Sequence, residues 1–221
     1  FLYLFYTIST CKKILEIGSS SCEFIEGLEL IDKLFQKKII NNKVKFYGIE
    51  TDEYFNFIPK YIAKSKNNNL KIYPSLVKFL KNNKKLNNFI LHDFGVSMYE
   101  FNSNKSFVNF LNKFESVFIK VAFSKKKGHF SNISGNKSYY FSIDETLKHI
   151  KKPAYFLFSA DKKKWSSIDT KSNDFLKDYF YIGNNIDKFQ KLVLQCKKNK
   201  FLNSYFNRIN LRILKAENLL K

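Results

Sequence analysis

Two carboxylates stand at or near the ends of two short apolar runs in the first quarter of the chain. The run Ile14 to Gly18 contains Glu16 and closes at a glycine, and the run Val44 to Ile49 stops at Glu50. An apolar run that closes in this way is typical of a buried parallel strand that meets a ligand-facing turn. Right-handed connections place two such strands side by side, so we expect Gly18 and Glu50 to meet at one sheet edge. A ribose held between them is the chemistry that this spacing favours.

The segment between these two runs has the pattern of an amphipathic helix. Ser20 and Glu23 have the spacing of a capping box, so we expect the helix to begin directly after the turn. Apolar residues then recur at helical spacing at Phe24, Leu28, Ile31 and Phe35. The chain from Lys12 to Asp52 is therefore predicted to run as strand, tight turn, helix, loop and strand.

This stretch also resembles the cofactor site of a known family. The sequences EIGSSSC at 16–22 and YGIE at 47–50 are similar to the corresponding motifs of the class I (Rossmann-like) S-adenosylmethionine-dependent methyltransferases. In that family an acid-x-Gly-x-Gly-x-Gly turn ends the first strand, and an acidic residue at the end of the second strand binds the ribose hydroxyls. Glu16, Gly18 and Glu50 match this pattern.

The resemblance implies a role for each matching residue. Gly18 permits the close turn, Glu50 accepts hydrogen bonds from the ribose, and Glu16 faces the methionine end of the cofactor. Ser20 belongs to the same turn, at a position where the family usually has a glycine. An acidic residue after the third strand often contacts the adenine amino group in the family, and this chain offers Ser75 there.

The chemistry of the turn favours S-adenosylmethionine over a dinucleotide. A pyrophosphate needs glycines, so that backbone N–H groups and a helix N-terminus can approach two negative charges. Here Ser20 and Cys22 carry Cβ atoms, and Glu16 places a negative charge near the phosphate position. S-adenosylmethionine has no phosphate, and its ammonium and sulfonium groups are cationic. The alternative is that the two acids are solvated strand ends in an α/β protein of another kind.

His92 and Asp93 form a second polar group, after the apolar run Phe89 to Leu91. In the family this segment follows the fourth strand and supplies an acid or a base, so the resemblance implies that either residue deprotonates or orients the acceptor. A general base contributes a factor of about 10² to 10⁴. For each residue singly we favour a structural role, with Asp93 capping a turn and His92 a satisfied strand-end residue. For the edge as a whole we favour a site.

The strand and helix patterns predict an α/β fold. Strand patterns occur at 14–18, 44–49, 70–73, 88–95, 116–123, 154–158 and 179–182. The resemblance implies a mostly parallel seven-stranded twisted sheet, with helices on both faces and the last strand antiparallel. We expect one domain over residues 1–221, with a core at about 12–184 and a C-terminal helical segment at 185–221. The polar stretch Ser124 to Tyr139 is predicted to be a loop or lid on the ligand side.

The composition indicates a folded, basic protein. The chain has 221 residues, 44% hydrophobic residues and a formal net charge of +20. Such a charge usually suggests nucleic acid. However, Arg208 and Arg212 are the only arginines, and the lysines are dispersed along the chain. Because arginine is the residue suited to bidentate phosphate and base contacts, we interpret most of this charge as solvated surface.

The cysteines predict neither a disulfide framework nor a zinc site. Cys11, Cys22 and Cys196 are odd in number and widely spaced, so we expect a reducing, cytoplasmic compartment and no metal. No apolar run reaches the length that spans a membrane. The chain begins at Phe1 rather than at Met, which leaves open that it is a piece of a longer protein.

Taken together, these features predict an enzyme. The expected reaction is methyl transfer from S-adenosylmethionine to an oxygen or nitrogen of a small or carbohydrate-like acceptor. One alternative is a nucleic-acid (RNA) methyltransferase or binding protein, which the charge favours. The other is a non-catalytic Rossmann-like module that supports a partner, which the missing glycines favour. The acceptor and the oligomeric state have no signal in the sequence.

Overall fold

The computed structural model describes residues 13–19, 44–51, 70–93, 95–124, 127–133, 136–159, 174–176, 179–198 and 211–215. The strands are β1 (Lys13–Ile17), β2 (Lys45–Ile49), β3 (Leu70–Tyr73), β4 (Phe89–Asp93), β5 (Ser116–Ile119), β6 (Ala122–Ser124), β7 (His129–Ile133), β8 (Asn136–Ser142), β9 (Ala154–Ser159), β10 (Asp174–Leu176), β11 (Tyr179–Ile182) and β12 (Leu211–Lys215). The helices are α4 (Leu76–Asn82), α5 (Ser97–Glu100), α6 (Asn104–Leu111), α7 (Ile143–His149) and α8 (Ile186–Lys198). The helix predicted after the Gly18 turn, with Ser20, lies outside the described residues.

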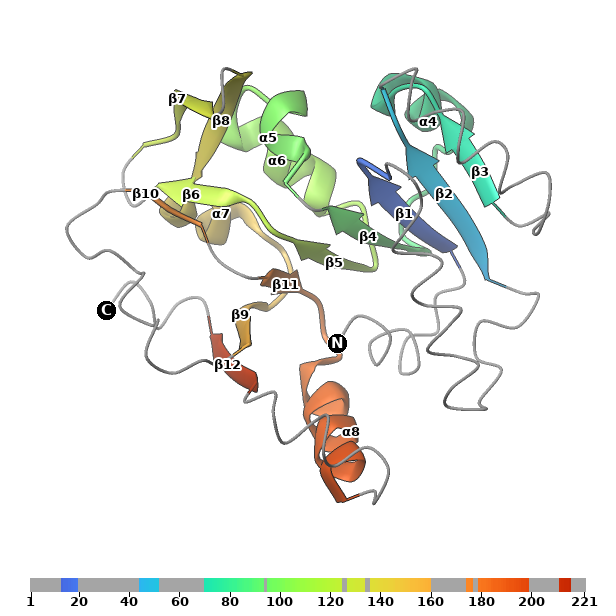
Figure 1. The fold of residues 1–221 in the computed structure, drawn as a ribbon, viewed down its shortest axis with the longest axis vertical. Helices are drawn as coiled ribbons and strands as arrows, with labels where there is room; N and C mark the ends of the chain where they lie inside the picture. Colours follow the sequence, from blue (N-terminus) through green and yellow to red (C-terminus); the bar gives the residue numbers. More distant parts are fainter. Residues whose placement is uncertain are drawn as a thin grey trace.

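A mixed sheet forms the centre of the molecule (Figure 1). Its eight strands have the order β12-β9-β11-β5-β4-β1-β2-β3. The five strands from β5 to β3 are parallel, and β11 runs antiparallel to both of its neighbours, β5 and β9. All seven predicted strands are present in this sheet, and the seventh, β11, is antiparallel. The predicted fold class is therefore confirmed, and β12 adds an eighth strand at the edge.

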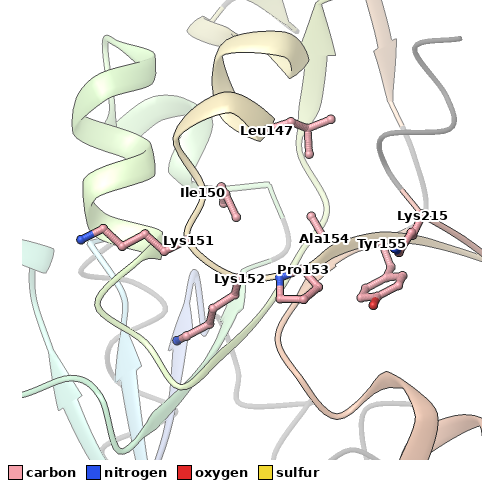
Figure 2. Close-up of a pocket in the computed structure, with 8 residues that line it drawn as sticks. All are labelled: Leu147, Ile150, Lys151, Lys152, Pro153, Ala154, Tyr155 and Lys215. Carbon is pink, nitrogen blue, oxygen red and sulfur yellow. The ribbon is translucent and has the colours of Figure 1, made fainter.

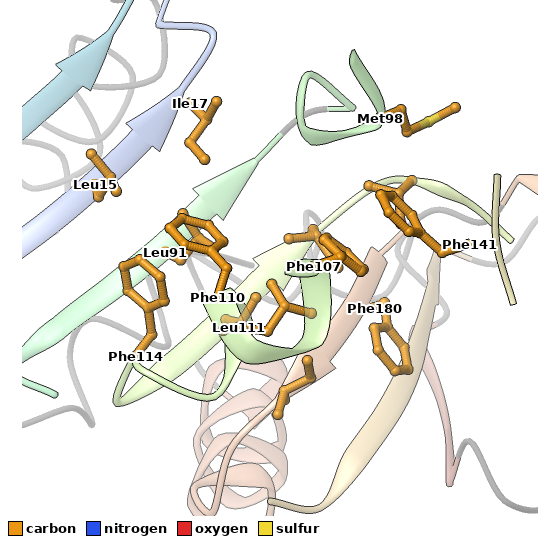
Figure 3. Packing of buried hydrophobic residues seen from close by; sticks show 14 of the residues in the cluster. Leu15, Ile17, Leu91, Met98, Phe107, Phe110, Leu111, Phe114, Phe141 and Phe180 are labelled. Carbon is orange, nitrogen blue, oxygen red and sulfur yellow. The ribbon is translucent and has the colours of Figure 1, made fainter. Parts of the chain in front are cut away.

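Both faces of β1, β2, β4 and β5 are buried, and successive side chains of each strand point to opposite faces. On one face, Tyr47 of β2 and Phe89 of β4 pack against Phe79 of α4, with ring centroids 5.0–6.0 Å apart. The core continues at α6, where Phe107 of this helix stacks on Phe141 of β8 (Figure 3). The alternate residues of β1, β2, β4 and β5 are buried as well: Ile14, Phe46, Ile90 and Phe118.

Serine side chains cap three of the helices. Ser75, Ser103 and Ser142 each accept a hydrogen bond from the backbone N–H three residues later, at the start of α4, α6 and α7. At α7, the Glu145 N–H donates to the Ser142 hydroxyl, and the Ser142 N–H donates to Oδ1 of Asn104. These caps satisfy backbone donors that the first turn of a helix leaves unpaired.

The prediction of a loop or lid at Ser124 to Tyr139 is wrong. The segment contains β7 and the first part of β8, which pair antiparallel and join β6 and β10 in a second, four-stranded sheet. The expected single strand at 116–123 is likewise divided, because the chain leaves the main sheet after Ile119 and enters the second sheet at Ala122. The physical reason that β8 forms is packing. Tyr139 and Phe141 lie on the same face of β8 with their rings in contact, and Phe141 is fully buried against Phe107 of α6.

The prediction of a helical segment at 185–221 is correct for α8 and wrong for Leu211–Lys215. These residues form β12, which pairs antiparallel with β9 over Tyr155–Ser159. The apolar residues of this stretch fit a spacing of two as well as a helical spacing, so periodicity alone does not separate the two structures. The open edge of β9 decides between them, because its backbone groups need hydrogen-bond partners.

Candidate functional site

The carboxyl edge of β1, β2 and β4 brings the predicted cofactor residues together. Ile17, Ile49 and Asp93 end these three strands in register. The N–H groups of Gly18 and Ser19 both donate to the carbonyl of Ile49, at 2.9 and 3.1 Å. Gly18 therefore lies directly beside the residue that precedes Glu50, as the strand pattern predicts.

Gly18 occupies a position that tolerates no side chain. Its φ is +74°, a backbone conformation that L-residues rarely adopt. A Cβ atom at this position would lie 2.3 Å from Cγ2 of Val96, in the loop that follows β4. The glycine thus lets the turn after β1 close against the loop after β4.

Gly48 has a similar function on β2, one that the sequence analysis missed. A Cβ atom on Gly48 would lie 2.7 Å from the hydroxyl oxygen of Ser19 and 2.5 Å from Cδ1 of Ile72. The Ser19 side chain is buried and fills this space. A glycine inside a strand pattern is the signal that indicates such a close approach.

Glu16 and His92, which the sequence analysis gives separate roles, form a buried pair. They are Cα partners on the adjacent parallel strands β1 and β4. Nδ1 of His92 lies 3.2 Å from Oε1 of Glu16, and the two side chains are 4% and 7% exposed. When the Glu16 carboxylate is ionised it only accepts hydrogen bonds, and in that state Nδ1 of His92 is the donor in this contact.

Asp93 caps the loop that follows β4. Its Oδ1 accepts hydrogen bonds from the backbone N–H groups of Gly95, Val96 and Ser97, at 3.1, 2.8 and 3.3 Å. The residue has no exposed surface. Burial raises the pKa of the Asp93 carboxyl above its ordinary value, while the hydrogen bonds from Ser97 and Val96 act in the opposite direction. The structural alternative for Asp93, a turn cap, is confirmed by these bonds.

The other two predicted cofactor residues differ in their surroundings. Glu50 directly follows β2, is 8% exposed and donates its backbone N–H to the carbonyl of Tyr73. Ser75 follows β3, and its hydroxyl accepts the N–H of Lys78 at the start of α4. The structure thus gives Ser75 a capping function, and its contact with adenine stays a prediction.

Buried charge is concentrated at this edge. Among the residues that the structure describes, the buried acidic and histidine side chains are Glu16, Glu50, His92 and Asp93. All four stand in the last two positions of β1 or β4, or directly after β2. Burying ionisable groups is unfavourable unless they are paired, and such groups gather at functional sites. Within the same described residues no cluster of His, Cys, Asp and Glu side chains suits a metal ion.

A pocket of about 300 Å³ lies elsewhere, where α7 ends and β9 begins (Figure 2). Ala154 of β9 pairs with Ile182, and Ile182 pairs with Val117 near the start of β5, so the pocket is at the opposite edge of the sheet. The ammonium group of Lys152 donates to the carbonyls of Phe114 and Glu115, and burial lowers the pKa of Lys152. This lysine therefore stabilises the turn between α6 and β5.

Searches of solved structures return methyltransferases with this fold. One is the O-methyltransferase of a trans-AT PKS multienzyme from Brevibacillus brevis, in complex with S-adenosyl-L-homocysteine. It is 13% identical, the match covers 86% of this chain and 73% of that chain, and the TM-score is 0.50. Another is the bifunctional kinase-methyltransferase WbdD, with 9% identity, 82% of this chain, 37% of that chain and a TM-score of 0.51. Neither a protein-family model nor a curated protein matches the sequence.

The chain therefore has the fold of the class I, Rossmann-like S-adenosylmethionine-dependent methyltransferases. At these identities the likeness concerns the fold alone. Within the described part of the chain, the helices are all too short or too polar to cross a membrane.

Proposed function

We propose that this protein transfers a methyl group from S-adenosylmethionine to an oxygen or nitrogen of a small or carbohydrate-like acceptor. The observation that carries the proposal is the gathering of Glu16, Glu50, His92 and Asp93, buried, at the carboxyl edge of the parallel strands. Ligands of open α/β sheets bind outside this edge. Two neighbours in fold are methyltransferases, and one of them was solved with S-adenosyl-L-homocysteine.

The geometry of the turn supports a ligand without phosphate. The N–H groups of Gly18 and Ser19 both donate to the carbonyl of Ile49. They are thus occupied within the protein, whereas a pyrophosphate needs such donors to point at it. Carboxylates at the same edge suit hydroxyl groups and cations, and S-adenosylmethionine has ribose hydroxyls, an ammonium and a sulfonium. The residues present therefore fit this cofactor better than a dinucleotide.

When bound, S-adenosylmethionine supplies an electrophilic methyl group on a sulfonium. Glu50 would accept hydrogen bonds from the ribose hydroxyls, and Glu16 would face the cationic methionine end. Because His92 and Asp93 are buried, we assign them a role in orienting groups at the site rather than in removing the acceptor's proton. Alignment of the acceptor with the methyl group supplies much of the rate in such a transfer.

Calorimetric titration with S-adenosylmethionine and S-adenosylhomocysteine tests the proposal. We expect Glu50→Ala to weaken the binding of both compounds roughly tenfold to a hundredfold, because hydrogen bonds to a charged group contribute about 1.5–3 kcal/mol. Asp187→Ala is the matched control, since Asp187 is an exposed carboxylate in the first turn of α8. Wild-type protein that is folded and binds neither compound would refute the proposal and favour a non-catalytic module.

The net charge of +20 supports an anionic acceptor as a second candidate, including RNA. Once cofactor binding is established, methyl transfer from labelled S-adenosylmethionine to small hydroxylated compounds and to RNA separates the two classes. Transfer to RNA that weakens steeply with salt would favour the second candidate.

A further inference from the structure

We propose that His92 is a positioning residue for Glu16. In this view its imidazole fixes the Glu16 carboxylate in the orientation that receives the amino-acid end of the cofactor. The inference rests on the proposed function, and it gives His92 a task other than proton abstraction.

The register of the sheet determines the contact between the two residues. Glu16 and His92 are Cα partners on neighbouring parallel strands, so their side chains leave the sheet on the same face. Each stands one residue before the end of its strand, and Nδ1 lies 3.2 Å from Oε1. With 3% and 6% of their surfaces exposed, both residues are shielded from water, where such a hydrogen bond is strongest.

The strand on the other side of β4 places an aromatic residue beside His92 in the sheet. The Cα partner of His92 on β5 is Phe118, which is 1% exposed and packs against Tyr181 with ring centroids 4.9 Å apart. The Cα partner of Glu16 on β2 is Gly48, which contributes no side chain. Among the Cα partners of Glu16, His92 is thus the one that can orient its carboxylate.

A positioning role has a consequence that depends on the ligand. Glu16 is expected to face the methionine end, so a displaced carboxylate should weaken binding of the amino-acid part of the cofactor. The adenosine part should be unaffected, because Glu50 would hold the ribose. 5′-Methylthioadenosine has the same adenine, ribose and sulfur as S-adenosylhomocysteine and lacks the amino-acid group, so it is the matched control ligand.

Two amide substitutions of His92 test whether the position of the hydrogen-bonding nitrogen matters, or only the polarity of the side chain. In His92→Asn the side-chain nitrogen occupies about the place of Nδ1, and in His92→Gln it occupies about the place of Nε2. We expect His92→Gln to lower the affinity for S-adenosylhomocysteine at least about tenfold and to change the affinity for 5′-methylthioadenosine by no more than about twofold. His92→Asn should bind both ligands nearly as the wild type does. Glu50→Ala should weaken both ligands together.

A double-mutant cycle completes the test. If His92 acts through Glu16, then His92→Gln has no further effect on binding in a Glu16→Gln background. Circular dichroism establishes that each variant is folded, and His92→Ser replaces His92→Gln if the latter does not fold. Unchanged binding of S-adenosylhomocysteine, or an equal loss for both ligands, overturns the inference while the proposed function stands. A wild type that binds neither ligand overturns both.

Discussion

Replacing Gly18 with alanine tests whether the turn after β1 needs a residue without a side chain. An L-residue at the φ of +74° is disfavoured by roughly 1–2 kcal/mol. The added methyl group would also lie 2.3 Å from Cγ2 of Val96, and such overpacking is typically unfavourable by about 1–3 kcal/mol. We therefore expect Gly18→Ala to lower the free energy of unfolding by about 2–5 kcal/mol, a large part of the roughly 5–15 kcal/mol of an ordinary domain.

Urea unfolding of four proteins measures this effect and its cause. The set is the wild type, Gly18→Ala, Val96→Ala and the double variant. Val96→Ala removes both methyl groups, so the nearest atom to the new methyl is then Cβ of residue 96, at 3.3 Å. The double variant should be about 1–3 kcal/mol more stable than the sum of the single effects predicts. A Gly18→Ala protein within about 0.5 kcal/mol of the wild type, or strictly additive losses, would refute this reasoning.

Further predictions concern α6, α7 and the loop after β4. Asn104 is buried and bonds the carbonyl and N–H of Ser142 at 2.9 and 3.0 Å, and Thr146 at 3.0 Å. Asn104→Ala should therefore lower the free energy of unfolding by about 2–4 kcal/mol, measured in urea. Asn112→Ala, which removes exposed bonds to His149 and Lys151, should lower it by less than about 1 kcal/mol. An equal effect would contradict the role of burial. Because burial raises the pKa of Asp93 above 3.8, the folded state holds this proton more tightly than the unfolded state. The stability that Asp93 contributes is fully present below pH 3.8 and declines as pH rises through the folded-state pKa. The unfolding free energy of the wild type minus that of Asp93→Asn should fall from pH 4 upward, and a rising difference would contradict the assignment.

The strands that carry the site could be predicted because they are buried on both faces. The apolar residues at 14–15 of β1 and 89–91 of β4 lead directly to Glu16 and His92, and short apolar runs of this kind are typical of buried parallel strands. The glycine and carboxylate at the strand ends then placed Gly18 beside Glu50. By contrast, β12 pairs with the edge of β9, and β7 stands at the edge of the second sheet. Their pairing depends on partners distant in the chain, which local patterns do not report.

The contact between Glu16 and His92 could not be predicted from local sequence patterns. Each residue could be singled out from its own strand, but 76 positions separate them in the sequence. Their contact follows from the order and register of β1 and β4, a property of the whole sheet. Gly48 and Val96 were missed for the same reason, since each matters only through an atom of the turn after β1.

The residues beside Glu16 and His92 in the sheet indicate that this pair has a functional rather than a structural role. Across β1, β4, β5, β11 and β9 the Cα partners in one row are Glu16, His92, Phe118, Tyr181 and Tyr155. The ring of Tyr181 lies 4.9 Å from that of Phe118 and 6.2 Å from that of Tyr155, so aromatic side chains fill the row from β5 to β9. Apolar replacements of buried ion pairs are often neutral or stabilising, and packing alone therefore gives no reason for a carboxylate and an imidazole here. A cationic ligand outside this edge does give one, because a held carboxylate in a water-excluded position attracts it strongly.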